Sequence, residues 1–293
     1  MIADRPLISV YLPTRNRARL LREAVESVLG QTCRDFELLI VDDGSDDQHS
    51  ADGGTQAVIE EFIARDHRIR AFRHEKPLGA PAARNRAIAE ARGQYLTGLD
   101  DDDLMLPRRL ESLIAARPED HAVVCSSFFL EKQGKRRRYN ERACLITLEN
   151  ILHYNLIDNQ AMVLTERARD IGGFDESLKA SQDYDFWTRL IERYGPAKRI
   201  SEPTYIRRES ISSDAITWSP RFAEGARQYT AKHCAKMNSA QLRSQRLLRK
   251  ITAREPIRLS EAPAHFSLGS ATVLLRYLAS QSSVLKRLLR RRP

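Results

Sequence analysis

QYLTGLDDDD, residues 94–103, joins an apolar run to four consecutive acids. A short apolar run of this kind is typical of a buried strand. The sequence therefore predicts that Asp100 to Asp103 stand at the carboxyl end of that strand. Carboxylates held this close together repel one another unless a cation neutralises them, so the acids indicate a site that binds one.

The same pattern, an apolar run followed by acids, occurs earlier in the chain. FELLIVDDGSDD, residues 36–47, is an apolar run that ends in acids, and LISVYLP, residues 7–13, is another apolar run; residues 17–30 between them have helical spacing. Apolar strands that alternate with helices predict a parallel sheet covered on both faces, in the α/β class. Ligands bind beyond the carboxyl ends of such strands. We therefore expect Asp43 and the acids of residues 100–103 to meet at one edge of the sheet.

Several carboxylates in this position favour a metal site. Mg²⁺ and Mn²⁺ prefer oxygen ligands and use one or two carboxylates together with substrate phosphates. We expect a divalent cation, Mn²⁺ or Mg²⁺, that joins these acids to a diphosphate. The alternative is that Asp103 caps a helix beginning near Pro107, and both interpretations can hold for different acids. Asp43 either accepts a hydrogen bond from a base or a ribose, or makes a local turn bond.

A second candidate region is SQDYDFWTRL, residues 181–190. Asp183 stands at the start of a predicted helix. It is either a general base for an acceptor hydroxyl or an acid favoured there by the helix dipole. Trp187 lies one turn further on and is either a platform for a sugar ring or part of the core, the more usual place for such a residue.

Charge is unevenly distributed over the 293 residues. Residues 241–293 hold 12 Lys and Arg against 2 Asp and Glu, whereas residues 1–240 hold 36 against 37. Leucines in residues 268–290 fall on one stripe, which predicts a basic amphipathic helix. That helix either lies on an anionic membrane surface or packs on the domain with its arginines in water.

Several features favour a cytoplasmic protein. The N-terminus lacks the apolar core of a signal peptide, and no apolar run reaches the roughly 20 residues of a membrane span. The four cysteines are scattered along the chain, which is typical of free thiols in a reducing compartment. Residues 268–293 leave peripheral attachment to the inner face of the cytoplasmic membrane as an option.

Four segments together resemble glycosyltransferase family 2, a group with the GT-A fold. They follow the family's order and usual separations, and four in register are far more specific than any one. The segments are ISVYLPTRNRARLLREAVESVLGQT (8–32), FELLIVDDGSDD (36–47), GAPAARNRAIAEARGQYLTGLDDDD (79–103) and GGFDESLKASQDYDFWTRL (172–190).

The resemblance, which covers about two-thirds of the chain, implies a GT-A fold with a mostly parallel sheet flanked by helices. We expect a catalytic domain at residues 1–210, with a nucleotide-binding half at 1–107 and an acceptor half at 108–210. A basic helical extension is expected at residues 211–293.

The resemblance also implies roles for single residues on the donor side. Pro13 and Thr14 match the loop that borders the nucleotide. Asp43 matches the acid that contacts the base, commonly uracil. Arg84 falls in the family's ARN segment near the donor.

The remaining roles concern the metal and the chemistry. Asp100 and Asp102 match the two acids of the DxD motif, with Asp102 as the metal ligand and Asp100 nearer the ribose. We expect Asp101, between them, to bind the donor as well. Asp183 matches the catalytic base. Gln182 stands where the family often has Glu, which puts a role for that preceding acid in doubt.

The function implied is an inverting transfer of a sugar from a nucleotide diphosphate donor, a UDP-sugar, to a hydroxyl. The expected acceptor is a saccharide or lipid-linked saccharide in cell-surface polysaccharide synthesis. A sugar nucleotidyltransferase is an alternative, but it needs a glycine-rich loop, and residues 13–17 contain no glycine. A basic nucleic-acid-binding protein is the other alternative; the charge lies in the tail and the body carries clustered acids, so no nucleic-acid partner is expected.

Overall fold

The computed structural model describes residues 5–49, 53–158, 160–209, 220–253, 255–266, 274–275 and 277–278. The chain forms two compact units. Unit 1 comprises Met1–Thr147, Ile157–Glu176 and Asp185–Ser210, and unit 2 comprises Leu148–Leu156, Ser177–Tyr184 and Ile211–Pro293. The units therefore do not divide at a single point in the sequence. The boundary between residues 210 and 211, and the two halves of the catalytic domain, stay predictions.

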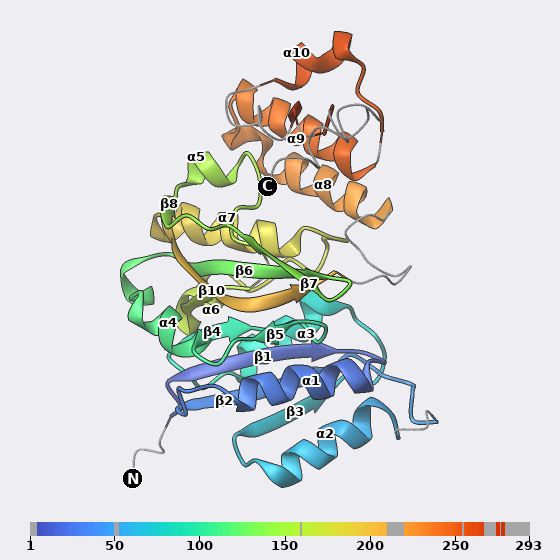
Figure 1. Ribbon diagram of the computed structural model, residues 1–293, viewed down its shortest axis with the longest axis vertical. Coiled ribbons are helices and arrows are strands. Elements are labelled where there is room, and N and C mark those ends of the chain that lie inside the picture. The colour runs from blue at the N-terminus through green and yellow to red at the C-terminus, as the bar shows by residue number, and fades with distance from the viewer. Residues whose placement is uncertain are drawn as a thin grey trace. The chain divides into compact units, whose positions relative to one another are not determined.

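Helices and strands alternate through the first part of the chain (Figure 1). The strands are β1 (Ile8–Thr14), β2 (Phe36–Asp42), β3 (Ile69–Arg73), β4 (Tyr95–Gly98), β5 (Leu104–Met105), β6 (Val124–Lys132), β7 (Lys135–Tyr139), β8 (Cys144–Ile146), β9 (Met162–Leu164) and β10 (Ala197–Arg208). The helices are α1 (Ala18–Leu29), α2 (Gly54–Arg65), α3 (Ala80–Glu90), α4 (Arg109–Ala115), α5 (Leu148–Ile151), α6 (Thr165–Asp170), α7 (Gln182–Tyr194), α8 (Pro220–His233), α9 (Ser239–Thr252) and α10 (Ala262–His265).

The strands of unit 1 form one sheet in the order β3-β2-β1-β4-β9-β6-β10-β5, with β7 beside β6 and β8 beside β10. β1 pairs in parallel with β2 and β4, as do β2 with β3 and β6 with β10. β9 runs antiparallel to both β4 and β6. The strands β1, β2, β4, β6 and β10 therefore all point the same way, and their carboxyl ends share one edge, called the carboxyl edge below. This confirms the predicted α/β class with a mostly parallel sheet flanked by helices.

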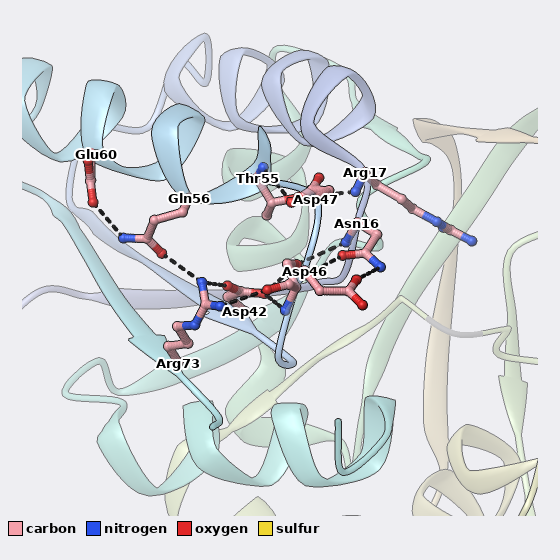
Figure 2. A network of polar contacts seen from close by, with 10 residues as sticks. Asn16, Arg17, Asp42, Asp46, Asp47, Thr55, Gln56, Glu60 and Arg73 are labelled. Atoms are coloured by element: carbon pink, nitrogen blue, oxygen red, sulfur yellow. Dashed lines mark hydrogen bonds and ion pairs between the residues drawn. The ribbon is translucent and has the colours of Figure 1, made fainter. Parts of the chain in front are cut away.

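The main core lies between the sheet and α1 and α2. Ile8, Val10 and Leu12 alternate along β1 and pack with buried residues of both helices. α1 buries Leu21, Ala24, Val25 and Val28, which is the stripe that a helix period of 3.6 residues produces. α3 lies on the other face of the sheet (Figure 1; Figure 2). The strands are apolar on both sides because both faces are covered.

One strand differs from the sequence prediction. β10 was not predicted, because Pro203 cannot donate to a ladder and argues against a strand. In the structure, β10 accommodates this proline because its register with β6 shifts twice, between Ile200 and Pro203 and between Pro203 and Ile206. α8 and α9 are separate helices within the helical extension expected at residues 211–293: α8 ends at His233, and Asn238 starts α9 with a capping box.

Gly98 allows a close approach between β4 and β1. A Cβ at Gly98 would lie 2.2 Å from ring atoms of Tyr11 on the neighbouring strand. We expect Gly98→Ala to lower the free energy of unfolding by about 1–3 kcal/mol, because overpacking forces the ring or the backbone to move. Urea denaturation checks this. Gly30→Ala is the control, since φ is −76° there and the nearest atom is a backbone oxygen at 3.3 Å; equal losses in both variants would contradict the steric account.

Within the part of the chain that is described, no helix combines the length and the apolar content needed to cross a bilayer. The amphipathic helix predicted over residues 268–290 lies outside the described residues, apart from Leu274, Leu275, Tyr277 and Leu278.

Candidate active site

The carboxyl edge of unit 1 collects the predicted donor-side residues. Pro13 and Thr14 end β1, and the Thr14 hydroxyl donates to Asp101 Oδ2 at 2.8 Å. Arg84 comes from α3, and its Nη2 donates to Asp100 Oδ1 at 2.9 Å. Thr14 and Asp101, 87 positions apart in the chain, thus meet because the parallel strands end at the same edge.

Asp43 follows β2 and holds the segment that leads into α3. Its Oδ1 contacts His74 Nδ1 at 2.8 Å and accepts from the Leu78 N–H at 2.9 Å, while Oδ2 accepts from the Gly79 N–H at 2.7 Å. Burial acts to raise the pKa of Asp43, but these hydrogen bonds outweigh it and hold the pKa below its usual value. The local turn bond that was the alternative for Asp43 is made by Asp42 instead, which accepts from the Ser45 N–H at 2.9 Å.

The acids after β4 form a cluster. Ligand oxygens of Asp100, Asp102 and Asp103 all lie within 4.8 Å of one another. Asp103 is 2% exposed, and it accepts from Gln160 Nε2 at 2.6 Å and from the Arg208 N–H at 2.9 Å. The helix-cap alternative for Asp103 is wrong, because α4 begins at Arg109 and its N-cap has no side-chain hydrogen bond.

Asp101, Asp102 and Asp103 resist ionisation. Burial raises the pKa of Asp101 to about 6, although the positive charge of Arg17 acts to lower it. The negative charge of Asp102 adds to the rise. Burial and the nearby Asp100 raise the pKa of Asp102. Burial, Asp100 and Asp102 raise the pKa of Asp103 well above its usual value. A divalent cation among these oxygens would neutralise the repulsion, so the donor set fits a hard metal ion.

Arg17 also belongs to this site, although its sequence pattern does not single it out. Its Nη1 lies 2.8 Å from Asp101 Oδ1 and 3.1 Å from Asp102 Oδ2, and its side chain is 38% exposed. Nothing in the spacing of TRNRAR distinguishes Arg17 from Arg15 or Arg19; only the folded loop brings it to the acids.

A polar network fixes the two loops that carry these side chains (Figure 2). The Asn16 N–H donates to Ser45 Oγ at 2.9 Å, and the Asn16 side chain exchanges hydrogen bonds with Asp46. Arg73 donates to Asp42 Oδ2 at 2.9 Å and to the Ser45 carbonyl at 2.6 Å. Asn16 has a φ of 54°, a backbone conformation that Asn tolerates better than most residues. The loop after β1 is therefore held in the shape that aims Arg17 at the acids.

Asp183 belongs to unit 2, in the first turn of α7. Its Oδ2 accepts from Asn155 Nδ2 at 2.9 Å. Trp187, in the part of α7 that belongs to unit 1, is 1% exposed, and its Nε1 donates to the Asp158 carbonyl at 2.6 Å. Trp187 is therefore a core residue, and the sugar-platform alternative is wrong.

Solved structures identify the fold. TarS 1–349 of S. aureus in complex with UDP-GlcNAc superposes with a TM-score of 0.65 at 20% identity, over 95% of this chain and 83% of that one. The mannosyltransferase PcManGT from Pyrobaculum calidifontis in complex with GDP-Man and Mn²⁺ gives 0.61 at 19% identity, over 97% and 83%. These similarities show that the chain has the GT-A fold.

Sequence comparison then gives the family. The family model for glycosyl transferase family 2 matches residues 9–178. The putative colanic acid biosynthesis glycosyl transferase WcaA of Escherichia coli K12 is 34% identical over 248 residues, covering 81% of this chain and 85% of that protein. The chondroitin synthase of Escherichia coli is 32% identical over 211 residues, which are 69% of this chain but 29% of that protein. This chain belongs to glycosyltransferase family 2 and is a glycosyltransferase, of the bacterial polysaccharide type.

Proposed function

We propose that this enzyme transfers a sugar from a UDP-sugar to an acceptor hydroxyl with inversion at the anomeric carbon, in a metal-dependent reaction. The acceptor is a lipid-linked saccharide that takes part in the synthesis of a cell-surface polysaccharide. The observation that carries the proposal is the cluster of Asp100, Asp102 and Asp103 at the carboxyl edge. The relatives support it: one is named for colanic acid biosynthesis, and structural neighbours hold UDP-GlcNAc or GDP-Man with Mn²⁺.

On the donor side, Pro13 and Thr14 border the nucleotide and Asp43 contacts the base. The lowered pKa of Asp43 keeps this carboxylate ionised, so it acts as an acceptor only. An ionised carboxylate suits a base that presents an N–H at its pairing edge, as uracil does. Arg84 holds Asp100, and the two lie beside the donor together with Asp101.

Asp102 is the proposed metal ligand, with Asp100 and Asp103 close enough to contribute. When bound, a divalent cation supplies positive charge that stabilises the departing diphosphate. Gln160 and the Arg208 N–H fix both oxygens of Asp103, which holds the cluster in place. Arg17 spans Asp101 and Asp102 at the solvent side and is placed to contact a diphosphate.

Asp183 is the proposed general base, which takes the proton from the attacking hydroxyl. Asn155 donates to one of its oxygens and so orients the carboxylate. The role rests on the family motif that Asp183 matches.

Residues 268–293 are proposed to attach the enzyme peripherally to the inner face of the cytoplasmic membrane. The five basic residues among 286–292 would each add about 1 kcal/mol of attraction to an anionic surface. Flotation of the full chain and of a chain ending at residue 267 with anionic liposomes tests this attachment. Equal partitioning of the two would count against it.

A panel of nucleotide sugars tests the proposed activity. We expect UDP-sugars to raise the melting temperature and to be hydrolysed slowly, and only when Mn²⁺ or Mg²⁺ is present. Once an acceptor is found, NMR of the product distinguishes inversion from retention. Stabilisation by a UDP-sugar that is unchanged by EDTA would refute metal dependence, and selective stabilisation by a GDP-sugar would refute the choice of uracil.

A further inference from the structure

The hairpin of β6 and β7 is a strongly basic, exposed surface of unit 1. Residues 131–142, EKQGKRRRYNER, contain six Lys and Arg residues and two Glu residues. Every side chain from Lys132 to Tyr139 is exposed. We call residues 131–142 the basic hairpin.

The turn of this hairpin places like charges opposite one another. Gln133 and Gly134 have φ angles of 50° and 72°, which two-residue hairpin turns require. The resulting register sets Lys132 directly across from Lys135. Like charges in this arrangement destabilise a strand pair, so a bound anion at the tip would offset a repulsion built into the hairpin.

Within the described ranges of the chain, two of these six cations pair with a carboxylate. Arg136 pairs with Glu131 at 2.7 Å, and Lys132 pairs with Glu209 at 2.9 Å. Among the residues that the structure describes, no carboxylate lies within ion-pair distance of the other four, which are Lys135, Arg137, Arg138 and Arg142.

An aromatic side chain accompanies the charges. The Arg137 guanidinium lies 5.7 Å from the centre of the Tyr139 ring, and Tyr139 is 38% exposed. That ring also stacks on Phe128, which is 4% exposed, with centroids 5.6 Å apart. An exposed Tyr whose ring packs on a buried Phe, beside Arg and Lys, suits the headgroup region of a membrane.

The basic hairpin extends from the carboxyl edge, where the acid cluster lies. β6 points the same way as β1 and β4, and its first residue, Val124, lies level with Thr97 near the end of β4. The later residues of β6 therefore extend outward from that edge. Arg208 joins the two features: its N–H donates to Asp103 Oδ1 at 2.9 Å, and its Nε lies 3.8 Å from Glu131 Oε1. Whatever binds the hairpin is therefore brought to the edge that holds the proposed donor site.

We propose that the basic hairpin binds the phosphate groups of an anionic phospholipid surface, and that this contact presents the carboxyl edge to the membrane. Charge complementarity, full exposure of the strand and the flanking Tyr139 favour this partner. That this contact brings the enzyme to an acceptor on a lipid carrier rests on the proposed function. The binding of the hairpin to the membrane does not depend on that function. The contact is separate from any made by residues 268–293.

Vesicle sedimentation with the full chain tests the proposal. The variant Lys135→Ser/Arg137→Ser/Arg142→Ser removes three cations from the hairpin. We expect it to bind vesicles containing about one-third phosphatidylglycerol at least tenfold more weakly than the unchanged chain, since each basic residue near such a surface contributes attraction. The charge-conserving variant Lys135→Arg/Arg137→Lys/Arg142→Lys should bind like the unchanged chain.

The matched control removes the same charge from the opposite edge of the same sheet. Arg5, Arg34 and Arg92 are exposed and precede β1, β2 and β4. Arg5→Ser/Arg34→Ser/Arg92→Ser should change vesicle binding by less than about threefold. Undiminished binding by the hairpin variant, or an equal loss in the control, would overturn the proposal. If the hairpin variant keeps vesicle binding but loses binding to heparin, the hairpin recognises an anionic saccharide, and the proposed membrane contact is wrong.

Failure of the proposed activity would look different. The vesicles contain neither donor nor acceptor, so their binding reports on the surface alone. Hydrolysis of a UDP-sugar in vesicle-free solution reports on the catalytic site, and the hairpin variant should keep that rate within about twofold. Loss of both vesicle binding and hydrolysis in the hairpin variant, with both kept in the charge-conserving variant, would show that these charges support the fold or the catalytic site and would refute their assignment to a membrane contact.

Discussion

Asp183→Asn is expected to slow sugar transfer by about 10²–10⁴-fold, the usual contribution of a general base, while donor binding stays within about twofold. Asparagine keeps the size of the side chain and can still be contacted by Asn155, but it cannot take the proton of the attacking hydroxyl. Initial rates at saturating donor and acceptor measure the loss, and calorimetric titration with the UDP-sugar measures donor binding.

Gln182→Ala is the matched control for this variant, because it changes the preceding residue of the same helix without removing a carboxylate. We expect it to keep transfer within about threefold. Near-normal turnover in Asp183→Asn would show that another group is the base. A parallel loss of donor binding would indicate that Asp183 acts on the donor rather than on the acceptor hydroxyl.

Asp102→Asn is expected to lower kcat/KM for the UDP-sugar by roughly 10³-fold, because a metal ligand near the diphosphate contributes several kcal/mol. Donor binding in the presence of Mn²⁺ should fall to its level in EDTA. Asp120→Asn, which changes an exposed acid paired with Arg117, should leave both quantities unchanged. Metal-stimulated donor binding that survives in Asp102→Asn would remove Asp102 from the metal site.

The same variant separates function from folding. Asp102 raises the pKa of Asp101 and of Asp103, so its charge opposes that of its neighbours in the metal-free protein. Removing that charge should leave the melting temperature in EDTA unchanged or higher, even though activity is lost. A large fall in melting temperature would instead mean that Asp102 holds the fold together.

The sequence predicted the elements whose pattern is local. β1, β2 and β4 are largely apolar because helices cover both faces of the sheet, and the acids follow β2 and β4 at a shared edge. β10 escaped prediction because Pro203 obscures its pattern, and its pairing with β5, β6 and β8 maintains it.

The contacts of the site depend on residues far apart in the chain. Asp103 had the spacing of a helix cap, yet Gln160 and Arg208 hold it from positions 57 and 105 residues away. Arg17 reaches Asp101 across 84 residues, and Asn155 reaches Asp183 across 28. Residue types and spacing identify the acids, whereas their partners emerge only from the folded chain.

The coupling between Mn²⁺ and UDP tests the central claim most directly. If a cation held by the acids after β4 also contacts a diphosphate, each ligand must strengthen binding of the other by the same factor. Electron paramagnetic resonance titration should show Mn²⁺ binding at least tenfold tighter with saturating UDP than with uridine, after allowing for the Mn²⁺ that UDP binds in solution. An Mn²⁺ affinity that is the same with UDP as with uridine would contradict the account.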